Sequence, residues 1–87
     1  MKIKKGFVLR KVGEQNVVVA VGAASRSFNG IIRLNDSGRY LWEKLQGGIT
    51  QQELLQAMLE DFDVDESVAR ADITAFIEKL EGAGLLE

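Results

Sequence analysis

The residue types that carry out most enzymatic chemistry are missing from this chain or are not grouped. It has no Cys and no His, which excludes thiolate nucleophiles, imidazole acid–base catalysis and the common zinc and haem ligands. No carboxylate pair can be assigned to acid–base work from its spacing, and neither a glycine-rich phosphate loop nor a nucleophile elbow is present. We therefore expect a protein that is not an enzyme and that carries no metal and no cofactor.

One acidic segment has the outline of a calcium-binding loop. Asp61, Asp63 and Asp65 alternate, and Asp72 falls at the twelfth position. The sixth position is Glu66, whereas such a loop needs glycine there for its sharp turn, and Asp72 is shorter than the bidentate Glu that usually closes the site. Acidic residues at the start of a helix explain the segment without a metal.

A short motif, Asp36-Ser37-Gly38, is similar to the Asp-Ser-Leu attachment site of a phosphopantetheinyl carrier protein. Glycine stands where the carrier has leucine, and the strand-like first third of this chain has no place in an all-helical carrier. We interpret the motif as the capped start of a helix.

The spacing of apolar residues predicts that three strands come first. Residues 7–12 and 17–21 are apolar runs on either side of a turn at residues 13–16, which indicates a β-hairpin. A small polar loop at residues 22–27 precedes a third predicted strand at residues 31–34.

Helical spacing begins at Asn35, and capping residues and glycines set the limits of three helices. We place them from Asn35 or Asp36 to Gly47, from a capping box at Thr50–Glu53 to about Phe62, and from about Asp65 to Gly82 or Gly84. Helices this short must bury an apolar stripe to be stable, and we expect Trp42 at the centre of that packing. The predicted fold class is α+β.

The length of 87 residues fits one domain, which we place over residues 1–87. The chain has no run of roughly 18 apolar residues that could span a membrane. It has no cysteines for a disulfide framework, and its N-terminus lacks the apolar stretch of a signal peptide. We expect a cytoplasmic protein without a membrane partner.

Charge is divided unevenly along the chain, which raises nucleic-acid binding as an alternative function. Residues 1–33 carry seven basic residues and one acidic residue, whereas residues 34–87 carry four basic and twelve acidic residues. A winged helix-turn-helix regulator would read DNA with its third helix, but most charged residues expected on that surface are acidic and would repel phosphates. The residues expected to be exposed there are Glu66, Arg70, Asp72, Thr74, Glu78, Lys79 and Glu81.

Peptide binding is the function that the predicted elements favour. A three-stranded sheet has two edges, and an uncovered edge offers unpaired amide and carbonyl groups that an extended peptide can join. If the third strand is an edge beside the third helix, then Arg33, Asp72 and Lys79 would add selectivity by charge. The same edge can pair with a second copy of the chain, so a homodimer stays open.

The order of the motifs resembles the coenzyme PQQ synthesis protein D family. The resemblance covers nearly the whole chain, and its most specific part is Leu-Asn-x-(Ser/Thr)-Gly-x-x-x-Trp at residues 34–42. The motifs that carry it are Gly30–Gly38, Leu41-Trp42, Thr50–Leu54, Phe62–Asp65 and Leu80–Leu86.

This resemblance implies a winged-helix-like domain that acts as a non-catalytic adaptor or chaperone. Family members are recognition elements for ribosomally made, post-translationally modified peptides. They bind the leader of a precursor peptide as an added strand between the third strand and the third helix, and they present it to a modifying enzyme. In the PQQ pathway that enzyme is a radical S-adenosylmethionine protein, so iron–sulfur chemistry would belong to the partner.

Carried over by position, the resemblance implies a groove with a strand wall and a helix wall. The strand wall would be Asn29, Gly30, Ile31, Ile32 and Arg33, and the helix wall would be Val68, Asp72, Ala75, Phe76 and Lys79. Because Ile32 and Leu34 share one face of the strand and Phe76 lies on the apolar stripe of the helix, these three can belong to the core. We expect Ile31, Arg33, Asp72 and Lys79 to border the channel.

Overall fold

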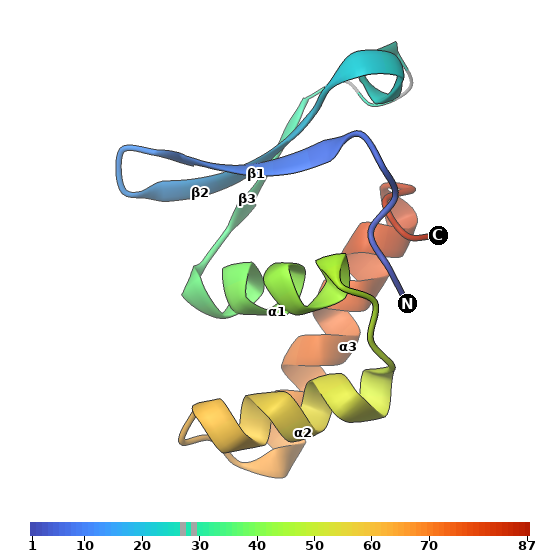
Figure 1. Cartoon of the computed structure of the whole chain (residues 1–87). Helices are drawn as coiled ribbons and strands as arrows, with labels where there is room; N and C mark the ends of the chain where they lie inside the picture. The colour runs from blue at the N-terminus through green and yellow to red at the C-terminus, as the bar shows by residue number, and fades with distance from the viewer. Residues whose placement is uncertain (27, 29) are drawn as a thin grey trace.

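A computed structural model describes residues 1–26, 28 and 30–87 and shows a small sheet followed by three helices (Figure 1). The predicted α+β class, with three N-terminal strands and three helices, is confirmed. The elements are β1 (Phe7–Val12), β2 (Gln15–Ala20), the 3-10 helix η1 (Gly22–Arg26), β3 (Ile31–Leu34), α1 (Asp36–Gln46), α2 (Gln51–Asp61) and α3 (Glu66–Gly82).

The sheet is antiparallel in the order β1-β2-β3, so β1 and β3 are its edges. The prediction of β2 at residues 17–21 was wrong at both ends, because Gln15 already pairs with Val12 and the strand ends at Ala20. The hairpin loop therefore contains only Gly13 and Glu14, and Gly13 has the positive φ of 63° that such tight turns favour.

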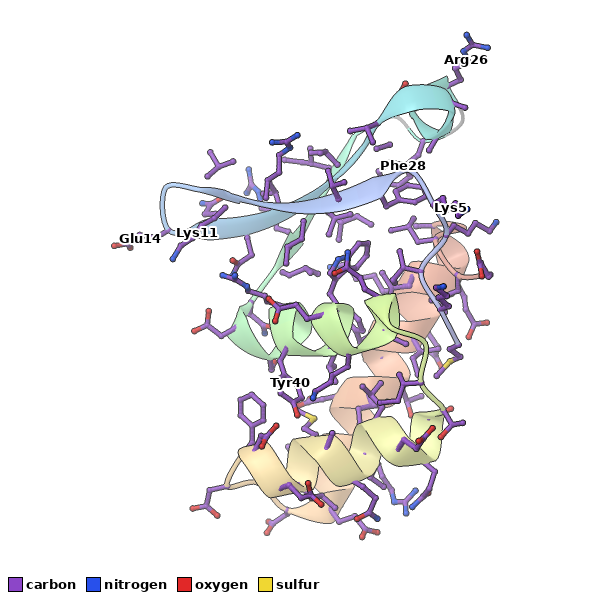
Figure 2. All side chains as sticks on the ribbon, in the orientation of Figure 1. Lys5, Lys11, Glu14, Arg26, Phe28 and Tyr40 are labelled. Atoms are coloured by element: carbon purple, nitrogen blue, oxygen red, sulfur yellow. The ribbon has the colours of Figure 1, made fainter. Side chains whose placement is uncertain are left out.

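Within the predicted polar loop at residues 22–27, the described residues form the short helix η1. Ser25 stabilises this turn, since its hydroxyl donates to the Gly22 carbonyl oxygen at 2.6 Å. Residue 27 lies outside the described residues. Phe28 follows it and packs edge-on against Phe7, with ring centroids 5.5 Å apart (Figure 2).

The helices lie on one side of the sheet, and the core fills the space between them (Figure 1). Val18, Ile32 and Leu34 face this core from the strands, and Trp42 is fully buried among them and the helices. The predicted central place of Trp42 is confirmed.

Local capping sets the starts of α1 and α2 as predicted. The Asn35 side chain accepts from the backbone N–H of Gly38 at 2.8 Å. Thr50 and Glu53 form the complete capping box, with both hydrogen bonds at 3.1 Å. The start of α3 differs, because the side chain of its N-cap residue Asp65 makes no capping hydrogen bond.

The acidic segment before α3 is not arranged as a metal site in the part of the chain that the structure describes. No group of three or more potential acidic ligands lies close enough together there to hold an ion. The Asp61 carboxylate instead accepts a hydrogen bond from the Tyr40 hydroxyl of α1. Among the same described residues, no helix is long and apolar enough to cross a membrane.

The first residues of the chain are tied to its last residues. Ile3 forms a bridge with Leu86, and the Lys4 N–H donates to the Leu85 carbonyl oxygen at 2.8 Å. The side chain of Ile3 is only 6% exposed and belongs to the core. The N- and C-termini consequently lie on the same side of the molecule (Figure 1).

Candidate functional site

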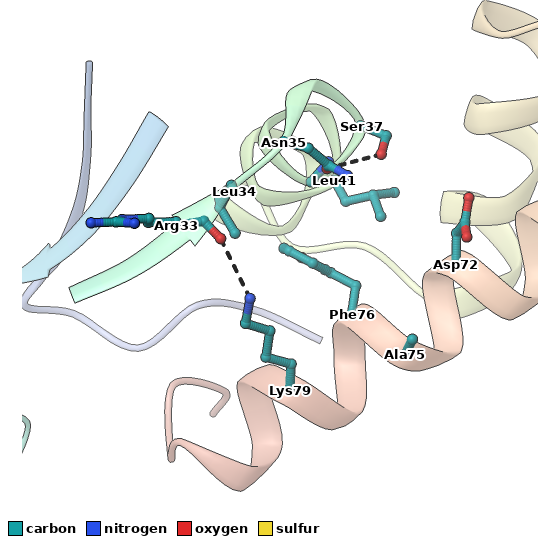
Figure 3. Close-up of a pocket in the computed structure, with 10 residues that line it drawn as sticks. Arg33, Leu34, Asn35, Ser37, Leu41, Asp72, Ala75, Phe76 and Lys79 are labelled. Atoms are coloured by element: carbon teal, nitrogen blue, oxygen red, sulfur yellow. Dashed lines mark hydrogen bonds between the residues drawn. The ribbon is translucent and has the colours of Figure 1, made fainter. Parts of the chain in front are cut away.

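A pocket of about 460 Å³ opens where β3, the start of α1 and the middle of α3 meet (Figure 3). Its floor is apolar, since Leu34, Leu41 and Phe76 present mostly buried side chains there. The complete lining is Arg33, Leu34, Asn35, Ser37, Gly38, Leu41, Asp72, Ala75, Phe76 and Lys79.

Half of the residues named from the sequence for the groove line this pocket. They are Arg33, Asp72, Ala75, Phe76 and Lys79. Four others lie outside the lining, namely Gly30, Ile31, Ile32 and Val68. Asn29 lies outside the described residues.

The exposed fractions show where three of the groove residues outside the lining lie. Ile32 is 8% exposed and faces the core, as the strand alternation had indicated. Ile31 is 54% exposed on the opposite face of β3, and Val68 is 48% exposed near the start of α3. Phe76 is only 8% exposed and serves both as a core residue and as part of the pocket floor.

The start of α1 forms a third wall that the sequence reasoning did not include. This wall contributes Asn35, Ser37, Gly38 and Leu41. A Cβ atom at Gly38 would come within 3.1 Å of the Asn35 side-chain oxygen and 3.4 Å of the Leu34 Cβ. Glycine therefore permits the close packing of α1 against the end of β3, and the Leu-Asn-x-Ser-Gly motif was the signal that could have identified this wall.

β3 presents backbone groups, and not only side chains, to the site. The Lys79 ammonium donates to the Arg33 carbonyl oxygen at 3.4 Å, so this carbonyl points away from β2 and towards α3 (Figure 3). Backbone groups alternate in direction along an antiparallel strand. The N–H and C=O groups of Ile31 and Arg33 consequently face the open edge, while those of Ile32 face β2.

The Arg33 side chain departs from the expectation that its charge borders the channel. Its guanidinium group points away from the pocket (Figure 3). The physical reason is the strand alternation, because Ile32 and Leu34 use the inner face of β3 and leave Arg33 on the outer face. Arg33 thus contributes its backbone to the pocket, and Asp72 and Lys79 contribute the charged side chains.

The exposed surface of α3 is acidic, as predicted. The exposed residues include four acids and two bases, and Arg70 is already paired with Glu66 at 3.1 Å. The seven residues predicted to be exposed are all exposed, namely Glu66, Arg70, Asp72, Thr74, Glu78, Lys79 and Glu81. Such a surface does not favour binding of a nucleic-acid backbone, because its carboxylates repel the phosphates.

The family model for coenzyme PQQ synthesis protein D (PqqD) matches residues 15–86. The chain belongs to the PqqD family. No curated protein gives a significant match to the sequence. The family match contains β2, β3 and all three helices, and therefore every residue that lines the pocket.

Two solved structures share the fold of this PqqD-family chain over nearly its whole length. TbiB1 in complex with the TbiA(beta) leader peptide is 23% identical and has a TM-score of 0.78, and the match covers 100% of this chain and 95% of that chain. Lasso peptide synthetase B1 complexed with the leader peptide is 18% identical and has a TM-score of 0.74, with 97% and 93% covered. The winged-helix-like arrangement of three strands and three helices is thus a known one.

Proposed function

We propose that this protein is a non-catalytic adaptor that binds the leader of a ribosomally made precursor peptide as an additional strand on β3. The observation that carries the proposal is the open edge of β3, where the backbone groups of Ile31 and Arg33 face outward beside an apolar pocket. An extended peptide can use both features at once, since its backbone pairs with the strand while alternate side chains enter the pocket.

Family membership and the fold neighbours support this proposal independently of the geometry of β3 and the pocket. Both neighbours are described as complexes with leader peptides. The family implies that the bound leader is presented to a modifying enzyme, which in PQQ synthesis is a radical S-adenosylmethionine protein. Precursor peptides are made on ribosomes, so we place this exchange in the cytoplasm.

The deciding experiment removes one outward-facing N–H from the edge of β3. Arg33→Pro deletes the N–H that an added strand would use, and it leaves intact the backbone bonds of Ile32 that hold β3 to β2. Arg33→Ala is the matched control, because it removes the same side chain and keeps the N–H. The probe is the leader segment of a short peptide encoded beside this gene, titrated into labelled protein and followed by amide chemical shifts.

We expect the leader to shift the amides of residues 30–34 and 66–80 in the native protein. Arg33→Pro should weaken binding by about tenfold or more, since it removes a hydrogen bond and places a ring at the edge, whereas Arg33→Ala should stay within about threefold. The dispersion of the remaining amide signals shows whether each variant is folded. Equal binding by both variants would overturn the proposal. It would also be overturned if the leader left the amides of residues 30–34 and 66–80 unshifted while duplex DNA shifted those of residues 2–11.

A further inference from the structure

Lys79 differs from an ordinary surface lysine because its ammonium group lies against the backbone of the edge strand. Its Nζ donates to the Arg33 carbonyl oxygen at 3.4 Å, across 46 positions of sequence (Figure 3). Among the described residues, the ion pairs are Arg39–Glu43 and Arg70–Glu66, so Lys79 has no carboxylate within ion-pair distance. The ammonium group of Lys79 is thus held beside the pocket with no carboxylate paired to it.

A strand added to β3 must compete with this ammonium group. The Arg33 carbonyl faces the open edge, and a peptide that pairs with β3 has to place its own N–H opposite that oxygen. Nζ must then shift from the position that the peptide N–H takes, while the long lysine side chain keeps it next to the bound peptide. A carboxylate on the peptide would be the natural new acceptor, because a charged acceptor forms a stronger hydrogen bond than a neutral carbonyl.

Asp72 places the opposite charge farther along the same pocket. Asp72 and Lys79 are seven residues apart on α3, which corresponds to about 10.5 Å along the helix, and Ala75 and Phe76 lie between them. Side chains on one face of an extended strand recur every 6.6 Å or so. A bound strand can therefore place one residue near Lys79, an apolar residue over Phe76, and another residue near Asp72.

We propose that Lys79 is a specificity-determining residue, which exchanges the Arg33 carbonyl for an acidic side chain of the bound peptide. The proposal deepens the peptide-binding function above and rests on it. The preferred ligand is an extended segment with an acidic residue and an apolar residue at alternate positions. Asp72 disfavours a second acid at the far end of the pocket, so the two charges together also set the direction in which the peptide lies.

The effect of Lys79 is moderate in size because Lys79 is exposed. An exposed ion pair changes affinity by up to about fivefold, and salt reduces this effect. Reversal of the charge replaces an attraction by a repulsion, so we expect a change of up to about tenfold for Lys79→Glu.

The experiment selects peptides from a displayed random library with three proteins in parallel. These are the native protein, Lys79→Glu and the control Lys11→Glu, which makes the same charge change at an exposed position near the tip of the β1–β2 hairpin (Figure 2). One selected peptide and its version with the acid replaced by an amide are then titrated into labelled native and Lys79→Met proteins. The amides of Ile31 and Arg33 report whether the peptide occupies the edge of β3.

We expect native protein and Lys11→Glu to enrich peptides with Asp or Glu at a constant distance from an apolar residue, and Lys79→Glu to lose or reverse this preference. The amide version should bind native protein about threefold to fivefold more weakly than the acidic peptide does. The two peptides should bind Lys79→Met with equal affinity. The role of Lys79 would be overturned if the selected peptides shifted the Ile31 and Arg33 amides but all three proteins showed the same preference for an acidic residue, or no such preference. The peptide-binding function would then still stand. Absence of any shift at those amides would overturn the function and this inference together.

Discussion

Tyr40 shows how a single side chain links two helices. Its hydroxyl lies 3.0 Å from the Ala57 carbonyl oxygen of α2 and also donates to the Asp61 carboxylate. Its ring packs edge-on against Phe62, with centroids 4.9 Å apart. Burial and the hydrogen bond to Asp61 raise the pKa of Tyr40 from 10.0 to about 12.

Tyr40→Phe should retain the ring contacts and lose the hydrogen bonds of the hydroxyl. We expect the free energy of unfolding to fall by about 1 to 2 kcal/mol near neutral pH. Because the folded state raises the pKa of Tyr40, its contribution is complete below pH 10 and is lost as the pH rises through about 12. Urea unfolding of both proteins at neutral and alkaline pH measures this difference, and a gap between the proteins that does not narrow in alkali would contradict the assignment.

The capping box of α2 stabilises the start of the helix. Thr50 accepts from the Glu53 N–H, and the Glu53 carboxylate accepts from the Thr50 N–H. The hydrogen bond from the Thr50 backbone lowers the pKa of Glu53, so this carboxylate stabilises the folded state above its ordinary pKa and loses that contribution as the pH falls.

Thr50→Val should weaken the start of α2 without changing the shape of the side chain. We expect a loss of about 1 kcal/mol in the free energy of unfolding, measured by denaturant titration. Thr74→Val is the control, since Thr74 is exposed in the middle of α3 and caps no helix. Equal losses in the two variants would show that the hydroxyl of Thr50 has no capping role.

At the scale of the whole molecule, the first residues contribute to the core although they precede the matched family region at residues 15–86. The backbone of residues 1–4 is hydrogen-bonded to residues 45, 49, 85 and 87. Ile3 covers the same core that contains Leu45 and Leu85. The segment therefore closes one side of the core.

Ile3→Ala should destabilise the entire domain. We expect a loss of about 2 to 4 kcal/mol, because the substitution removes buried methyl groups and leaves a cavity. In a domain of this size, each kcal/mol corresponds to a fall in Tm of about 4 to 8 °C. Thermal unfolding followed by circular dichroism measures it, with the exposed Lys5→Ala as the control; if both variants melt at the native temperature, the segment is not part of the cooperative unit.

Signals within a few residues of one another determined most of the secondary structure. Asn35 and the Thr50–Glu53 box marked helix starts from sequence because a cap and its acceptor or donor are close in the chain. The limits of β2 were predicted less well, since polar Gln15 and Asn16 suggested a turn, and their pairing depends on strands that are distant in sequence.

The sequence by itself thus determined the order of the elements, the helix starts, the central place of Trp42 and the acidic surface of α3. The tertiary structure alone decided that α1 forms a wall of the pocket and that Arg33 turns its backbone, and not its charge, towards α3. It also decided that Lys79 reaches the edge of β3. Local hydrogen bonds and apolar periodicity depend on neighbouring residues. The directions of the edge groups depend instead on the pairing of β3 with β2, and the reach of Lys79 depends on how α3 packs beside β3 across 46 positions of sequence.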